Sequence, residues 1–186
     1  MHRIHALISS LVALVCAVGA MGCSSSPSAA PPGCSSNPVS FSKDVMPAFA
    51  MSCSLSSSAC HAQMNNPQAN LYLGMMGGGG GSADANAVHA GLVGVHAKED
   101  PSMNLVTAGD LQNSFLWHKV NDDATTLNQG ALATACAKAT MAMCTDCSST
   151  TPCGGTMPYL SEPLSTGAPD RLCTIQNWIM QGAQNN

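Results

Sequence analysis

The chain opens with a short basic segment followed by one continuous apolar run. Its first three residues, Met-His-Arg, precede a stretch from 4 to 21 that is interrupted only by His5, Ser9 and Ser10. A run of this length and alanine content is typical of a secretory signal peptide and is short for a membrane-spanning helix. We therefore predict that residues 1–22 form a signal peptide and that no later segment crosses a bilayer.

Helical periodicity returns at residue 41. Ser42 can cap a helix that has Pro47 near its first turn and runs into Cys53. The apolar positions of this helix fall on one side and are Val45, Met46, Phe49 and Ala50. The clearest helix is the last one, which Pro169 and Asp170 start and Gly182 ends. Its apolar face carries Leu172, Ile175, Trp178 and Ile179.

The middle of the chain has a weaker pattern. A helix is expected after Gly109, with Asp110 as its cap and an inward face of Leu111, Phe115, Leu116 and Val120. Residues 62–87, which are rich in Asn, Gly and Met, predict a loop, with the glycine run 77–81 at the surface. Residues 121–156 predict a loop-rich, cross-linked insertion. We find no convincing strand pattern, so we expect a mainly α-helical domain with long loops.

The segment between the signal peptide and the domain predicts a lipid-anchored tether. Residues 24–40 are dominated by Ser, Pro and Ala, a composition typical of flexible linkers. The signal peptide ends in Ala-Met-Gly before Cys23, which resembles a bacterial lipobox, so Cys23 would carry the lipid. The alternative is ordinary cleavage nearby, with Cys23 a plain thiol. We therefore divide the chain into residues 1–22, a linker at 23–40 and a domain at 41–186, exported and tethered to the cell membrane or outer membrane.

The cysteine content fits an oxidising compartment. Of the ten cysteines, eight follow the linker cysteine: Cys34, Cys53, Cys60, Cys136, Cys144, Cys147, Cys153 and Cys173. An even number of cysteines in an exported chain predicts disulfides. The first and last of them can reach each other or the central cluster. The tether and domain carry five Lys and Arg against ten Asp and Glu. A chain with no basic patch does not suit nucleic acid, nor membrane contact other than through the lipid.

One motif in the chain carries recognisable cofactor chemistry. Cys60 is followed at once by His61, and Cys53 precedes them. In the attachment motif for c-type haem, two thiols add to the haem vinyl groups and the adjacent histidine binds iron. The usual spacing places two residues between the cysteines, whereas this chain has six. The intervening residues, mostly Ser and Ala, are small and flexible enough to bulge outward and bring the thiols together.

Four segments of the chain resemble a class I cytochrome c domain of exported bacterial lipoproteins. Residues 41–61 are similar to the first helix and haem site, and residues 106–120 to the middle helix. The GGTMP sequence at 154–158 is similar to the loop that offers methionine to the iron, and residues 169–184 to the closing helix. The segments also occur in the same order. The resemblance implies a cytochrome c-like fold with one covalently bound haem c.

The resemblance also assigns roles to individual residues. Cys53 and Cys60 would hold the porphyrin, His61 would be the proximal iron ligand and Met157 the distal one. Thioether ligation raises the reduction potential and, with both axial positions filled, no site remains for a substrate. The implied function is electron transfer with redox partner proteins of the cell envelope, rather than catalysis.

Two other functions remain open at this point. Cys53 and Cys60 can form a disulfide with each other, which would make the protein a haem-free surface or binding module. A soft-metal site for copper(I) is also conceivable in a short segment containing Met141, Met143, Cys144 and Cys147. Structural disulfides explain the same cysteines more simply.

The remaining histidines have ordinary interpretations. His89 and His96 are alternative distal ligands, although surface or loop positions are the more usual role for such residues. His118 falls within the expected middle helix, where we predict that it faces solvent. Met157 itself is one of many methionines, most of which must fill the core. Hydrolase motifs of the GxSxG and HExxH types do not occur in the sequence.

Overall fold

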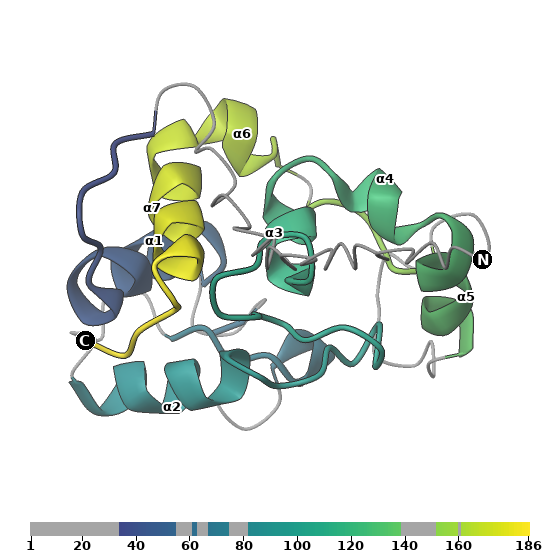
Figure 1. The fold of residues 1–186 in the computed structure, drawn as a ribbon, viewed down its shortest axis with the longest axis horizontal. Coiled ribbons are helices and arrows are strands. Elements are labelled where there is room, and N and C mark those ends of the chain that lie inside the picture. The colour runs from purple at the N-terminus through teal and green to yellow at the C-terminus, as the bar shows by residue number, and fades with distance from the viewer. Residues whose placement is uncertain (1–33, 55–60, 63–66, 75–81, 139–151, 160) are drawn as a thin grey trace, which may run out of the picture.

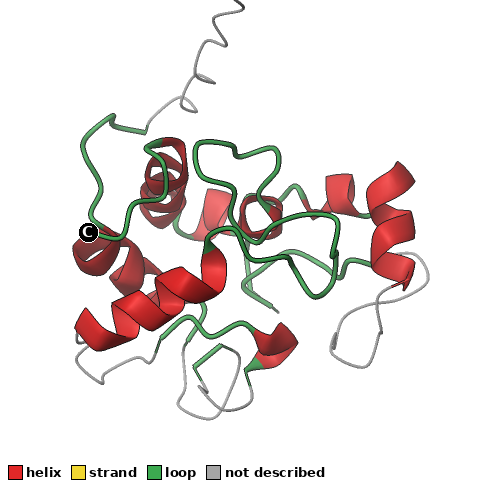
Figure 2. Ribbon diagram, turned by 60° about the horizontal axis from the view of Figure 1, so that its bottom comes forward, coloured by secondary structure: helices red, strands yellow, loops and turns green. Residues whose placement is uncertain are grey.

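The computed structural model of the protein describes residues 34–54, 61–62, 67–74, 82–138, 152–159 and 161–186. Within these ranges the structure is helical with long loops, and β-pairing is limited to isolated bridges (Figure 2). This confirms the expected mainly α-helical fold. The predicted signal peptide, the lipobox cysteine Cys23, Cys60 and the soft-ligand segment 141–147 lie outside the described residues.

Nine helical elements occur in the described ranges (Figure 1). They are η1 (Phe41–Val45), α1 (Met46–Ser52), η2 (Gln68–Asn70), α2 (Ser82–Leu92), α3 (Phe115–Val120), α4 (Ala124–Leu127), α5 (Gly130–Lys138), α6 (Leu164–Gly167) and α7 (Pro169–Met180). None of these helices is long and apolar enough to cross a membrane.

The first helix lies where the sequence places it but has a different cap. Ser40, not Ser42, caps the π-helical turn η1, because its Oγ accepts a hydrogen bond from the Lys43 amide at 3.3 Å. The Asp44 carboxylate in turn accepts from the Ser40 amide at 2.8 Å, which satisfies a second donor at the helix start. Val45, Met46 and Phe49 are buried as predicted.

The core is organised around Trp178 on α7. Its ring centroid lies 4.9 Å from that of Phe41 and 6.5 Å from that of Phe49, so α7 packs against η1 and α1. Figure 1 shows α7 beside α1, with the C-terminus nearby. The four predicted apolar positions of α7 are all buried. Gly182 has φ of +95°, a conformation that ends the helix and favours glycine.

Helix α2 was not predicted and lies partly in the segment that we expected to be a loop. Its buried side chains Ala85, Val88 and Leu92 recur at helical spacing. Most other residues of α2 are small or polar, so the apolar stripe stands out poorly from its surroundings. The glycine run at 77–81 lies outside the described residues.

The middle helix begins later than predicted. The Asp110 carboxylate accepts hydrogen bonds from the backbone and side-chain nitrogens of Asn113, at 3.2 and 2.6 Å, and therefore closes a turn instead of capping α3. Phe115, Leu116 and Val120 are buried as expected. The prediction for His118 was wrong, because this residue is only 1% exposed.

Two disulfides join distant parts of the described chain. Cys34 bonds Cys173 of α7, which answers the pairing that the sequence left open for these two cysteines. Cys136 of α5 bonds Cys153, within the segment predicted to be cross-linked. That segment is also more helical than predicted, since it contains α4 and α5.

Candidate functional site

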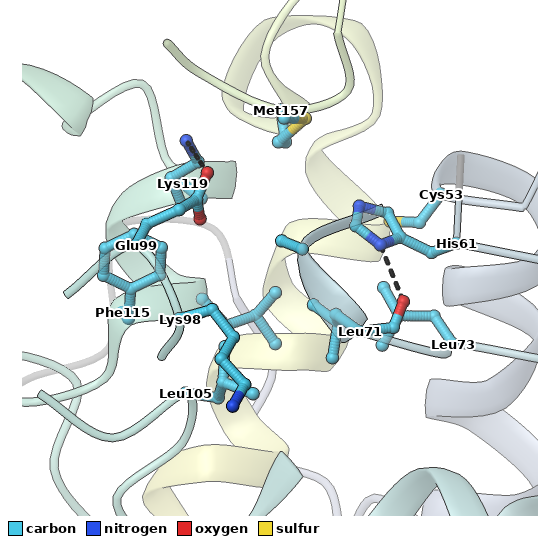
Figure 3. Close-up of a pocket in the computed structure, with 12 residues that line it drawn as sticks. Cys53, His61, Leu71, Leu73, Lys98, Glu99, Leu105, Phe115, Lys119 and Met157 are labelled. Carbon is cyan, nitrogen blue, oxygen red and sulfur yellow. Dashed lines mark hydrogen bonds and ion pairs between the residues drawn. The ribbon is translucent and has the colours of Figure 1, made fainter. Parts of the chain in front are cut away.

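One cavity brings together three of the residues that the resemblance assigns to haem. Cys53, His61 and Met157 all line it, although they come from separate segments of the chain (Figure 3). The rest of the wall is mainly apolar and includes Leu71, Leu73, Leu105, Phe115 and Leu116. A mainly apolar lining with a few polar groups is typical of cofactor and ligand pockets.

The backbone closes the long segment between Cys53 and His61. Cys53 ends α1, where its amide donates to Phe49 at 2.7 Å. The His61 amide donates to the Cys53 carbonyl at 3.2 Å. The two described residues that flank this segment, Cys53 and His61, therefore lie side by side. Cys60 itself lies outside the described residues.

The ring of His61 is oriented by a neighbouring carbonyl. Nδ1 lies 2.8 Å from the oxygen of Leu71, and this contact is the dashed line beside His61 in Figure 3. A carbonyl can only accept, so Nδ1 carries the proton and Nε2 keeps its lone pair. Metal-binding histidines are commonly held in this way, by a hydrogen bond from the nitrogen that does not bind the metal.

The surroundings of His61 keep its imidazole neutral. Loss of hydration on burial lowers the pKa of His61 below its ordinary value of 6.5, and the positive charge of Lys119 lowers it further. Hydrogen bonds to the backbone of Leu71 and Gln68 oppose this effect. A lowered pKa leaves the imidazole deprotonated, which is the form that binds a metal.

This pKa shift predicts that the stabilising effect of His61 depends on pH. The unfolded chain binds a proton on this histidine more readily than the folded chain does, so the contribution is fully present above about 6.5. It is lost as the pH falls from there toward the lower pKa of the folded state. Urea unfolding of the haem-free chain and of His61→Gln should show the stability of the wild type falling relative to the variant below about pH 6.5. A constant difference across that range would contradict the shift, and His96→Gln is the matched control.

Met157 reaches the cavity from a different segment. It lies in the loop that follows Cys153, and its amide donates to the carbonyl of Lys119 at 2.6 Å. Its side chain is partly buried and packs against the core. The methionine singled out by its GGTMP context thus lies at the same cavity as His61 (Figure 3).

The other candidate histidines do not line this cavity. Nε2 of His89 lies 2.7 Å from the carbonyl oxygen of Ala183, and the His89 ring packs edge-on against the ring of Phe41. His96 is exposed. The buried ring of His118 lies between the Asp123 carboxylate, 2.9 Å from Nδ1, and the Gln112 carbonyl, 3.0 Å from Nε2. None of the three is placed to compete with Met157.

The side chains that could bind the iron suit haem, but the volume of the cavity does not. Haem iron needs only two axial ligands, and an imidazole together with a thioether is a known pair. The cavity measures about 40 Å³, however, which is space for roughly three water molecules. A porphyrin would therefore require the wall around Met157 to move away from the wall around His61.

Comparison with protein-family models, curated proteins and solved structures finds no match to this chain. The described residues also contain no group of three or more His, Cys, Asp and Glu side chains suited to a metal ion. The function must therefore be inferred from the cavity and its lining.

Sequence reasoning missed the charged residues of this cavity. Lys98, Glu99 and Lys119 all line it, and Lys119 is only 4% exposed. A lysine next to a run of apolar residues in the middle helix was the available signal. Its partner, the carbonyl of Cys153, lies 34 positions away and could not be inferred from spacing.

Proposed function

We propose that this protein binds one haem c and transfers electrons in the cell envelope. The observation that carries the proposal is the convergence of Cys53, His61 and Met157 on one mainly apolar cavity. These residues were assigned from two short sequence motifs and their resemblance to a known family, and the first and last of them are 104 positions apart. The lone pair left on Nε2 of His61 adds support.

Each residue would have a distinct task toward the haem. Cys53 and Cys60 would attach it, while His61 and Met157 would bind its iron. The haem would supply the one-electron couple. The leucines and Phe115 exclude water, and the buried ammonium of Lys119 favours the state of lower positive charge. With His61 and Met157 both bound to the iron, the protein would be a carrier and not an enzyme.

The setting of this activity is also part of the proposal. Disulfides persist in oxidising compartments, and the described chain has two of them. We infer an exported domain tethered through a lipid on Cys23, which exchanges electrons with redox partner proteins in the envelope.

A second candidate function follows from the small cavity. A volume of about 40 Å³ suits a domain that needs no cofactor, and the two disulfides help to hold such a domain together. In that case Cys53 and Cys60 would form a disulfide, and the protein would be a binding or structural module.

A spectrum distinguishes the two functions. The full chain is exported in a host that matures c-type cytochromes, and absorption is recorded in the reduced and oxidised states. We expect a sharp α-band on reduction and haem that stays on the denatured chain. His61→Ala should abolish stable holoprotein, whereas His96→Ala, at an exposed position, should not. A colourless wild-type protein beside a matured control cytochrome would favour the haem-free module.

A further inference from the structure

A polar groove lies between the first described segment and α7. It measures about 310 Å³, against about 40 Å³ for the cavity around His61. One wall is the segment 35–39 and the other is α7, and the two lie side by side in Figure 1. Small-molecule sites occupy roughly 300–1,000 Å³, so the groove is large enough for a small ligand.

The fold holds the two walls of the groove together. Cys34 joins the start of the segment covalently to Cys173. The Asn177 side chain donates to the carbonyl of Ser35. Further along, the side chain of Gln181 bonds twice to the backbone of the segment, each time at 2.9 Å. The groove is therefore preformed, as ligand sites usually are.

One face of α7 is polar and lines the groove. Asp170, Thr174 and Asn177 recur at helical spacing and so lie on the same side of the helix. The Thr174 hydroxyl donates to the carbonyl of Asp170 at 2.9 Å, and its oxygen can still accept from a ligand. The Asp170 carboxylate is exposed and has no ion pair or hydrogen-bond partner among the described residues.

The segment 35–39 adds further hydrogen-bonding groups and some apolar surface. Ser35 and Asn37 line the groove, and only their backbone carbonyls are bound to α7. Their hydroxyl and amide side chains can both donate and accept. Val39 and the disulfide at Cys173 form the apolar part of the lining.

The charge of the groove restricts the class of ligand. Of the described residues that line it, only Asp170 is charged. A phosphate or carboxylate ligand would find no Lys, Arg or His in this lining. A neutral sugar ring fits, because each of its hydroxyls donates and accepts, and a carboxylate accepts from hydroxyls in charge-assisted hydrogen bonds. The C–H groups of such a ring can pack against Val39.

We propose that this groove binds a neutral sugar ring and that the Asp170 carboxylate accepts hydrogen bonds from its hydroxyls. The site does not depend on the proposed haem, because Cys53, His61 and Met157 do not line it. Carbohydrate binding is a second activity of the chain, beyond electron transfer.

Titration of the full chain with glucose, galactose and N-acetylglucosamine, followed by NMR of its amides, tests the groove. We expect at least one of these sugars to shift amides of residues 35–39 and 170–177 saturably, with a dissociation constant on the order of 1 mM. Asp170→Asn should weaken binding roughly tenfold. Glu162→Gln is the matched control, because Glu162 is an exposed carboxylate outside the groove, and it should leave the dissociation constant unchanged.

Several results would overturn the proposal. They are no saturable shift with any of the three sugars, shifts confined to residues outside the groove, and binding to Asp170→Asn as tight as to the wild type. If Asp170→Asn disturbs amides of the core, Asn37→Ala decides, because that side chain is exposed. Weaker binding to Asn37→Ala supports the site, and unchanged binding overturns it.

Charged relatives of glucose test the class of ligand. Glucose 6-phosphate should bind more weakly than glucose, because its phosphate is repelled by Asp170. Tighter binding of glucose 6-phosphate would overturn the assignment to neutral sugars. Binding of protonated glucosamine without binding of any neutral sugar would also overturn it and would indicate an amine ligand.

Discussion

Replacing Trp178 by alanine is expected to destabilise the domain by about 3–5 kcal/mol, the usual cost of deleting a large buried aromatic side chain. Trp178 is 1% exposed, and its ring packs against Phe41 of η1 and Phe49 of α1. Its indole nitrogen also donates to the carbonyl of Gln184 at 2.9 Å, which ties the C-terminal segment to α7. The free energy of unfolding, measured with guanidinium on the haem-free chain, checks this prediction.

Two variants calibrate the result for Trp178. Trp178→Phe keeps an aromatic ring but loses the hydrogen bond, so it should lower the free energy of unfolding by less than Trp178→Ala does. Tyr159→Ala removes an aromatic side chain that is 49% exposed and should change stability by about 0.5 kcal/mol or less. If Trp178→Ala cost no more than Tyr159→Ala, the packing of α7 against η1 and α1 would not be the core of this domain.

Removing the Cys34–Cys173 disulfide is expected to cost even more. This bond joins residues separated by 139 positions, whereas Cys136 and Cys153 are separated by 17. Loop-closure entropy predicts losses of about 5 kcal/mol for the long loop and about 3 kcal/mol for the short one. The double serine variants of each pair, unfolded in parallel, measure the two losses.

The informative result is which of the two disulfides contributes more to the free energy of unfolding. Hydrogen bonds also hold the first segment to α7, since Gln181 donates to Asn37 and accepts from Val39, each at 2.9 Å. These contacts do not involve the two cysteines, so we expect the serine variant to keep them. A larger loss for the Cys136 and Cys153 pair would mean that local packing, and not chain entropy, sets the contribution of the disulfides.

The helices that the sequence predicted best are those with strong boundary signals. In α7, Pro169 and Gly182 mark the ends and four large apolar residues mark one face. In α2 the buried face consists of Ala85, Val88 and Leu92 amid other small residues, so periodicity hardly distinguishes it. His118 was misplaced because burial depends on what covers a helix, which periodicity alone does not show.

In the candidate site, too, some residues could be predicted from the sequence and others could not. Cys53, His61 and Met157 were identified because each belongs to a short, recognisable motif. The carbonyl of Leu71 that orients His61 and the buried Lys119 carry no such signal. Their roles depend on backbone groups, which every residue possesses, and these are brought close only by the fold.

The Cys34–Cys173 bond also determines where a pull on the tether would act. With the lipid that we propose on Cys23, eleven residue steps separate the anchor from Cys34, so the domain could move at most about 40 Å from the membrane surface. Force along that tether would pass through a covalent bond into α7, at the centre of the core. Most of the load would therefore bypass the segment that follows Cys34, which hydrogen bonds of Asn37 and Val39 hold to Gln181.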